Sequence, residues 1–282
     1  MDSLEAISSR SLFLETSCFV QAVVRSEAKA KRVMNDFPDF ERSSLDFSIV
    51  PDITAPGAFD QCIKDAPPLD VIIRAASPFK YTEAKTHSDS INPAIHGTTE
   101  ILKSAAKEEG TSGDLSLAYW ASKTFAEQAE FMKTQKPSFE LGARSSSSST
   151  RPSFTDLSGI ALIRGPPVPE DFLHVYVAVR DLSFAHYQTA FAPGVGGRRF
   201  LVTPGSNSNQ EICDILRKEF PELDEKIPLG RPGQHALPAG SFKIDNWSSQ
   251  KELGVTYRPF ETTVADTARN LLEMEKALTA KA

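Results

Sequence analysis

Short runs rich in β-branched residues alternate with longer segments of helical character through the first half of the chain. The runs 19–26, 45–53 and 69–79 predict β-strands, the last being the strongest of the three. Helix-length segments lie between and after them, at 27–37, 55–66 and 92–110, with Pro93 expected in the first turn of the last helix and Gly110 at its end. This alternation indicates βαβ units, so we expect an α/β fold with a doubly wound parallel sheet. Such sheets bind ligands beyond the carboxyl ends of their strands.

The second half of the chain is more mixed. Five consecutive serines at 145–149 lie in a segment that can bury little apolar surface, and we expect it to be disordered. The later elements are expected to form a smaller region that covers the substrate. A helix is predicted over 118–135, before the serine run; the later elements are a strand and then a helix over 175–191, a strand over 198–204, and helices over 209–220 and 261–278.

Composition narrows the class of protein. Apolar residues make up 40% and charged residues 24%, as in globular proteins, and a formal net charge of −6 argues against nucleic acid as the main partner. No apolar run approaches the ~18 residues of a membrane-spanning helix. Glu15 interrupts the N-terminal apolar stretch without a cleavage signature, so we expect no signal peptide. Cys18, Cys62 and Cys213 are odd in number and far apart, which indicates thiols of a reducing compartment, and we expect a cytoplasmic protein.

The strongest chemical pattern is Tyr119 with Lys123, four residues apart on the predicted helix 118–135. This spacing places both side chains on one helix face, where the ammonium lowers the pKa of the phenol and suits it to donate a proton to a carbonyl oxygen. The alternative is a pair of surface helix residues.

The scattered histidines have no carboxylate or cysteine at ligand spacing, so no metal site is expected.

Several further blocks occur in a fixed order, and with them the chain resembles the extended short-chain dehydrogenase/reductases. The resemblance is to the branch of dihydroflavonol reductases, cinnamoyl-CoA reductases and fungal aldehyde or methylglyoxal reductases. The blocks are VVRSEAKAKRV (23–33), IVPDIT (49–54), VIIRAASPF (71–79), NPAIHGTTEIL (92–102), AYWASKTFAEQAE (118–130), VAVRDLSFAH (177–186) and RRFLVTPGSNSNQEICDILRKEFPEL (198–223).

The resemblance implies an incomplete Rossmann-like sheet, with an NADP-binding domain over 1–155 and an interleaved substrate-binding region over 156–282. It implies transfer of a hydride from NADPH to the carbonyl group of a small aldehyde or ketone. Tyr119 would protonate the oxygen, while Lys123 would tune Tyr119 and hold the ribose of the cofactor. Two alternatives stay open: a catalytically impaired reductase-like protein from a truncated gene model, and a nucleotide-sugar epimerase or dehydratase.

Arg25 and Lys29 match the pair that holds the 2′-phosphate of NADP in this family. A guanidinium pairs with phosphate, whereas an acidic residue at this place would bind the ribose of NAD. The alternative is an exposed basic helix start. The resemblance places Asp52 and Ile53 against the adenine of the cofactor. The alternative is that they are plain turn residues.

The resemblance places three small residues at a strand end beside the cofactor: Ala75, Ala76 and Ser77. They could equally serve tight strand–helix packing. Arg180 and Asp181 match a family turn that we interpret as structural, an ion pair or a cap.

The chain departs from the family pattern in three places. No glycine precedes Gly57, so residues 1–16 stand where the family has a glycine-rich phosphate loop. No strand-end serine precedes Tyr119 in the manner of the family's catalytic serine, and Ser112 and Ser116 match it by type only. The serine run at 145–149 occupies the place of a loop that flanks the nicotinamide.

Overall fold

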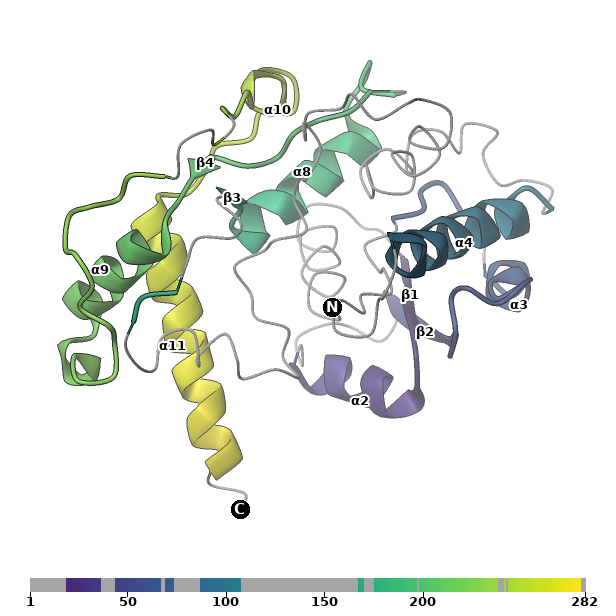
Figure 1. The fold of residues 1–282 in the computed structure, drawn as a ribbon. Helices are drawn as coiled ribbons and strands as arrows, with labels where there is room; N and C mark the ends of the chain where they lie inside the picture. Colours follow the sequence, from purple (N-terminus) through teal and green to yellow (C-terminus); the bar gives the residue numbers. More distant parts are fainter. Residues whose placement is uncertain are drawn as a thin grey trace. The chain divides into compact units, whose positions relative to one another are not determined.

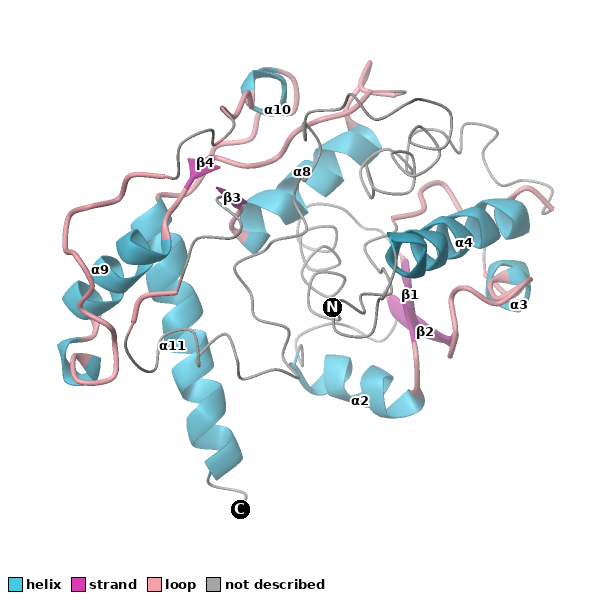
Figure 2. Cartoon of the chain, in the orientation of Figure 1, coloured by secondary structure: helices cyan, strands magenta, loops and turns pink. Residues whose placement is uncertain are grey.

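The computed structural model describes residues 19–36, 44–66, 69–73, 87–107, 167–169, 175–196, 198–237, 241 and 243–279. The chain divides into two compact units (Figures 1 and 2). The first comprises residues 1–144 and 183–200, and the second comprises residues 145–182 and 201–282. No helix within the described ranges is long and apolar enough to cross a bilayer.

The first unit contains a parallel βαβ unit. Strand β1 (Val20–Val24) leads through helix α2 (Glu27–Asp36) to strand β2 (Leu45–Ile49). The strands pair in parallel from Val20 opposite Leu45 to Val24 opposite Ile49, and the Val50 N–H extends the ladder to the Val24 carbonyl at 2.8 Å. This arrangement confirms the strands predicted over 19–26 and 45–53 and the helix between them.

Helices α3 (Asp60–Lys64) and α4 (His87–Ala105) follow in the first unit. One core joins them to the strands: Val50, Phe59, Ile63, Ile101 and Ala105 are buried, and half-buried apolar residues of β1 and of the loop after β2 pack on them. These contacts position the loop between β2 and α3, residues 50–59.

Two predictions in this unit are wrong in detail. Helix α4 begins at His87, so Pro93 lies inside it and not in its first turn. The helix continues past Pro93 at the loss of one backbone hydrogen bond, because the turns that follow pack on the core through Ile101 and Ala105. The strand predicted over 69–79 is irregular in its described part, 69–73.

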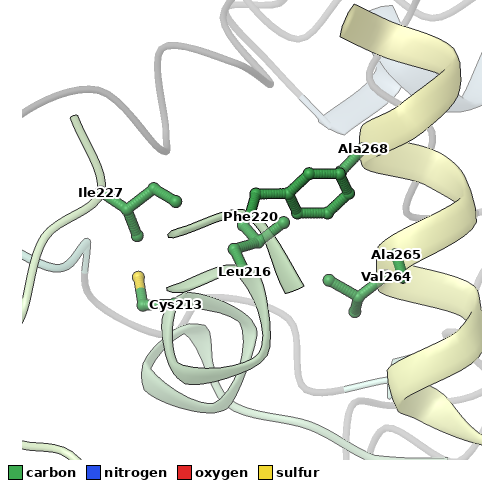
Figure 3. Packing of buried hydrophobic residues seen from close by; sticks show 7 residues of the cluster. All are labelled: Cys213, Leu216, Phe220, Ile227, Val264, Ala265 and Ala268. Atoms are coloured by element: carbon green, nitrogen blue, oxygen red, sulfur yellow. The ribbon is translucent and has the colours of Figure 1, made fainter. Parts of the chain in front are cut away.

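In the second unit, helix α9 (Asn209–Glu219) packs against helix α11 (Phe260–Thr279). The Ser208 Oγ caps α9 by accepting a hydrogen bond from the Glu211 N–H at 3.2 Å. Both helices had been predicted, and their apolar spacing matches the core between them (Figure 3). The buried residues of this core are Cys213, Leu216, Phe220, Ile227, Val264, Ala265 and Ala268.

A short antiparallel pair precedes α9: β3 (Val175–Tyr176) lies beside β4 (Gly205–Ser206). Helix α8 (Val179–Phe191) follows β3, as the prediction over 175–191 had it. The strand predicted over 198–204 is wrong, because its residues form no backbone ladder. Thr203 instead joins β3 through its side chain, whose Oγ1 donates to the Tyr176 carbonyl at 2.6 Å. The remaining elements are the 3₁₀ turn η1 (Pro221–Leu223) and helix α10 (Trp247–Lys251).

Candidate functional site

The candidate site lies where β1 and β2 end. The strands run parallel and in register, so their carboxyl ends meet at one edge of the sheet. Arg25 follows β1 directly, and Asp52 comes three residues after β2. Hydrogen bonds from Thr54 lower the pKa of the Asp52 carboxyl; burial opposes them, and the charge of Arg25, the smallest contribution, also lowers the pKa. Both residues therefore lie at this edge of the sheet, where the charge of Arg25 acts on Asp52.

Asp52 shapes the loop that follows β2. Its Oδ1 accepts hydrogen bonds from the Thr54 backbone N–H at 2.8 Å and from the Thr54 hydroxyl at 2.7 Å. Ile53 is half-buried and packs against the core that includes Val50 and Phe59. Ile53 thus combines a place in the core with a partly exposed surface beside Asp52.

The N-terminal turn of α2 carries the predicted pair of cations. The Ser26 carbonyl accepts the N–H groups of Lys29 and Ala30 at 3.0 and 3.2 Å, which starts the helix directly after Arg25. Arg25 is exposed and Lys29 is half-buried. A helix N-terminus attracts anions through its free N–H groups and its dipole. The donors in this turn suit a phosphate group, although Glu27 adds one negative charge there.

Five predicted site residues lie outside the described residues: Ala75, Ala76, Ser77, Tyr119 and Lys123. They remain predictions. Of the predicted cofactor residues, the structure brings Arg25 and Asp52 to one edge of the sheet and places Lys29 and Ile53 in the adjoining turn and loop.

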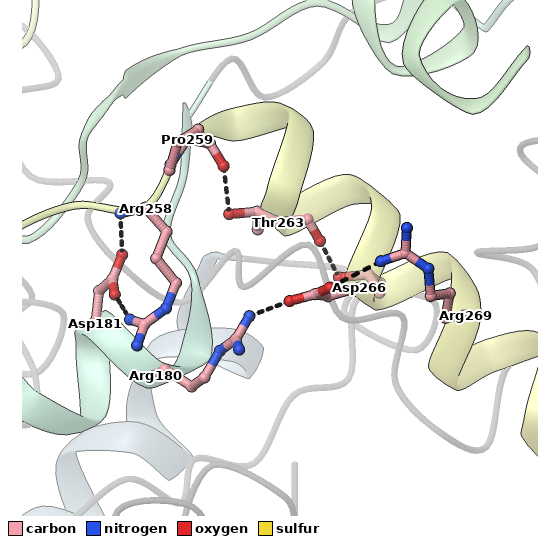
Figure 4. Close-up of polar contacts among 8 residues, drawn as sticks. Arg180, Asp181, Arg258, Pro259, Thr263, Asp266 and Arg269 are labelled. Atoms are coloured by element: carbon pink, nitrogen blue, oxygen red, sulfur yellow. Dashed lines mark hydrogen bonds and ion pairs between the residues drawn. The ribbon is translucent and has the colours of Figure 1, made fainter. Parts of the chain in front are cut away.

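Arg180 and Asp181 are structural, as predicted (Figure 4). The Asp181 side chain is 1% exposed, forms an ion pair with the Arg258 guanidinium and accepts the Arg258 backbone N–H at 2.9 Å. Arg180 pairs with Asp266, which also accepts from Arg269 at 3.1 Å. These pairs connect the first turn of α8 with α11 and with the residues just before α11.

Tyr176 belongs to the core of the second unit. Burial is the main cause that raises its pKa to about 12, and its ring centroid lies 4.3 Å from that of Phe260. Its burial and this ring contact make Tyr176 a packing residue.

The two described cysteines are free thiols. Burial is the main cause that raises the pKa of Cys62, and it raises the pKa of Cys213 to about 11. Both thiols are therefore poor nucleophiles near neutral pH.

Across the described ranges, no group of three or more His, Cys, Asp or Glu side chains could hold a metal ion.

Sequence reasoning missed the polar face of α4. Glu100, Ser104 and Lys107 follow one another at helical spacing and bind the loop and helix after β2. The spacing itself was visible in the sequence, but their partners lie 43 to 47 residues away.

Comparison with known proteins finds sequence similarity over most of the chain to several fungal proteins, although no protein-family profile matches the chain. An uncharacterized oxidoreductase of Saccharomyces cerevisiae is 30% identical over 322 residues, with 92% of each chain covered. A ketoreductase of Aspergillus niger is 29% identical over 316 residues, again with 92% of each chain covered. An NADPH-dependent methylglyoxal reductase of Saccharomyces cerevisiae is 28% identical over 324 residues and 94% of each chain.

Among solved structures, the yeast methylglyoxal/isovaleraldehyde reductase complexed with NADPH superposes with a TM-score of 0.70. The identity is 24%, and the match covers 96% of this chain and 95% of the reductase. This likeness confirms the predicted Rossmann-like α/β fold. The alignment with the Aspergillus ketoreductase runs over 316 positions, more than the 282 residues of this chain, so that relative holds residues with no counterpart here.

Proposed function

The chain belongs to the extended short-chain dehydrogenase/reductase family, in the branch of fungal ketoreductases and methylglyoxal reductases, and from this premise we propose that it is an NADPH-dependent reductase of small aldehydes and ketones. The observation that carries the proposal is the likeness, over more than nine-tenths of the chain, to several oxidoreductases. Two of these relatives, the Aspergillus ketoreductase and the yeast methylglyoxal reductase, are reductases, which disfavours a nucleotide-sugar epimerase or dehydratase.

The residues at the ends of β1 and β2 fit NADPH. Arg25 and Lys29 stand at the N-terminal turn of α2, and we assign them to the 2′-phosphate. A guanidinium offers paired donors to phosphate oxygens, and the free N–H groups of the helix start add to them. We assign Asp52 and Ile53 to the adenosine side of the site. The family pattern extends this assignment to Ala75, Ala76 and Ser77, small residues that allow close approach of the cofactor.

Tyr119 and Lys123 carry the proposed chemistry. NADPH, when bound, supplies the hydride that reduces the carbonyl carbon. Tyr119 donates its phenolic proton to the carbonyl oxygen as negative charge develops there. We assign Lys123, four residues further along the sequence, two roles: on a helix it would share a face with Tyr119 and lower the pKa of the phenol, and it would also bind the ribose.

We further assign residues 1–155 to cofactor binding and 156–282 to substrate binding. The division into two interleaved units, the first of which holds β1, β2 and Arg25, supports this assignment. The free thiols Cys62 and Cys213 support a reducing compartment, and we propose the cytoplasm.

The test is turnover by the purified full chain. NADPH consumption is followed with methylglyoxal, isovaleraldehyde and an aromatic ketone, and Tyr119→Phe is measured beside the wild type. We expect turnover with at least one substrate and a loss of about 10²-fold or more in kcat for Tyr119→Phe. NADPH binding without turnover on a broad panel would make the chain a reductase by ancestry only, and unchanged turnover in Tyr119→Phe would refute the proton donor.

A further inference from the structure

We infer that Glu100 on α4 is a positioning residue for the cofactor site, acting through the loop between β2 and α3. The inference rests on the proposed function, because this loop (residues 50–59) carries Asp52 and Ile53. Glu100 forms no hydrogen bond with either residue. Its hydrogen bond to the loop is at Gly57, five residues after Asp52 and four after Ile53.

Glu100 is 8% exposed and bonds in two directions. Its Oε2 accepts the Gly57 backbone N–H at 2.8 Å, and its Oε1 accepts the Lys103 ammonium at 2.8 Å. Hydrogen bonds from the Lys103 ammonium, which has the larger effect, and from the Gly57 N–H lower the pKa of Glu100. The carboxylate is therefore ionised at neutral pH. A charged acceptor on a backbone N–H makes a stronger bond than a neutral one.

The same face of α4 holds the next part of the chain. Asp60, the first residue of α3, accepts the Ser104 hydroxyl at 2.6 Å and the Lys107 ammonium at 2.7 and 2.9 Å. Ser104 is 1% exposed, so its hydroxyl has no competing access to water. Two side chains of α4, Glu100 and Ser104, together with Lys107 just after its end, therefore fix Gly57 and Asp60.

Gly57 is adapted to this contact. Its φ is +70°, a conformation that side chains other than glycine rarely adopt, and a Cβ there would lie 2.9 Å from the Asp60 Oδ2. The chain can therefore turn at Gly57 with its N–H directed to Glu100 and with Asp60 in reach of Ser104 and Lys107.

Asp52 and Ile53 lie between two fixed points. At the start of the loop, the Val50 N–H bonds to the Val24 carbonyl at the end of β1. At its end, Gly57 and Asp60 are bound to α4. A loop that is ordered before binding loses less conformational entropy when the ligand arrives, so Glu100 strengthens cofactor binding without contact.

The test compares Glu100→Ala with Glu100→Gln in the full chain. The amide oxygen of Gln can still accept the Gly57 N–H, whereas Ala cannot. We expect Glu100→Ala to raise the Kd of NADPH and of 2′,5′-ADP about tenfold, to leave the Kd of nicotinamide mononucleotide and kcat unchanged, and Glu100→Gln to restore most of the affinity.

Two controls separate positioning from general destabilisation. Glu222→Ala removes an exposed carboxylate of the second unit and should change no affinity. Leu216→Val trims a buried side chain in the core of the second unit, outside the core that packs on this loop, and should lower the unfolding midpoint while the Kd of NADPH stays within about twofold.

The outcomes distinguish the inference from the function on which it rests. If the wild type binds neither NADPH nor 2′,5′-ADP, the proposed function fails. If the wild type binds both and Glu100→Ala binds them equally well, the function stands and the positioning role of Glu100 is refuted. A parallel loss of affinity for nicotinamide mononucleotide, or an equal loss in Leu216→Val, also refutes it.

Discussion

The buried carboxylate of Asp181 binds Arg258 twice, through the guanidinium and through the backbone N–H at 2.9 Å (Figure 4). Asp181 lies in the first turn of α8, and Arg258 lies two residues before α11. One acidic side chain thus fixes two segments that are 77 residues apart in the sequence.

Asp181→Ala should destabilise the protein. It leaves the Arg258 N–H without its acceptor and the guanidinium without its counter-charge. We expect a loss of about 2 kcal/mol in the free energy of unfolding, below the roughly 3–5 kcal/mol of a fully buried pair because Arg258 reaches solvent. Arg180→Ala is the matched control: its ion pair with Asp266 is exposed and should contribute less than about 1 kcal/mol. Urea unfolding checks both, and equal losses would contradict the assignment.

A second prediction concerns acid stability through Asp214. Burial raises the pKa of this carboxyl, but the Gly233 N–H, His235 and Gln210 together lower it below the ordinary 3.8. A lowered folded-state pKa stabilises the fold above the unfolded-state value, and this contribution disappears as the pH falls through the folded-state value.

Asp214→Asn should therefore be less stable than the wild type above about pH 4, and the difference should shrink as the pH falls further. Unfolding free energies between pH 2.5 and 7 measure this. Glu225→Gln, which also replaces a carboxylate by an amide but at an exposed site, is measured alongside as the control for the change of charge. A difference for Asp214→Asn that is constant across the range would show that its charge contributes nothing.

Arg25 should set the preference for the phosphorylated cofactor. Arg25→Ser removes the guanidinium that we assign to the 2′-phosphate, so we expect the Kd of NADPH to rise about tenfold or more while the Kd of NADH stays unchanged. Lys64→Ser, which removes an exposed lysine of the same unit, should leave both values unchanged. Equal weakening of both cofactors by Arg25→Ser would place Arg25 away from the 2′-phosphate.

Local patterns were enough to predict the βαβ unit and the edge that carries the site. The spacing of apolar residues gave β1, α2 and β2, and parallel pairing then brings Arg25 and Asp52 to one edge. The start of α4 was misjudged because proline favours a first turn, whereas core packing carries this helix past Pro93.

Contacts between distant residues were beyond prediction. The run 198–204, which predicted a strand, forms no backbone ladder, and Thr203 joins β3 by a side-chain hydrogen bond to a residue 27 positions away. Glu100 and Gly57 are 43 residues apart, and neither belongs to a motif. Tyr119 and Lys123 lie outside the described residues, so their roles rest on the family pattern and the variants proposed above.

The most direct test of the central claim is calorimetric titration of the full chain with NADPH, with NADH alongside. We predict saturable binding of NADPH that is at least about tenfold tighter than that of NADH, because one charge-assisted contact to the 2′-phosphate supplies such a factor. Absence of saturable binding at millimolar NADPH, or equal affinity for the two cofactors, would contradict the assignment of the site at Arg25, Lys29 and Asp52.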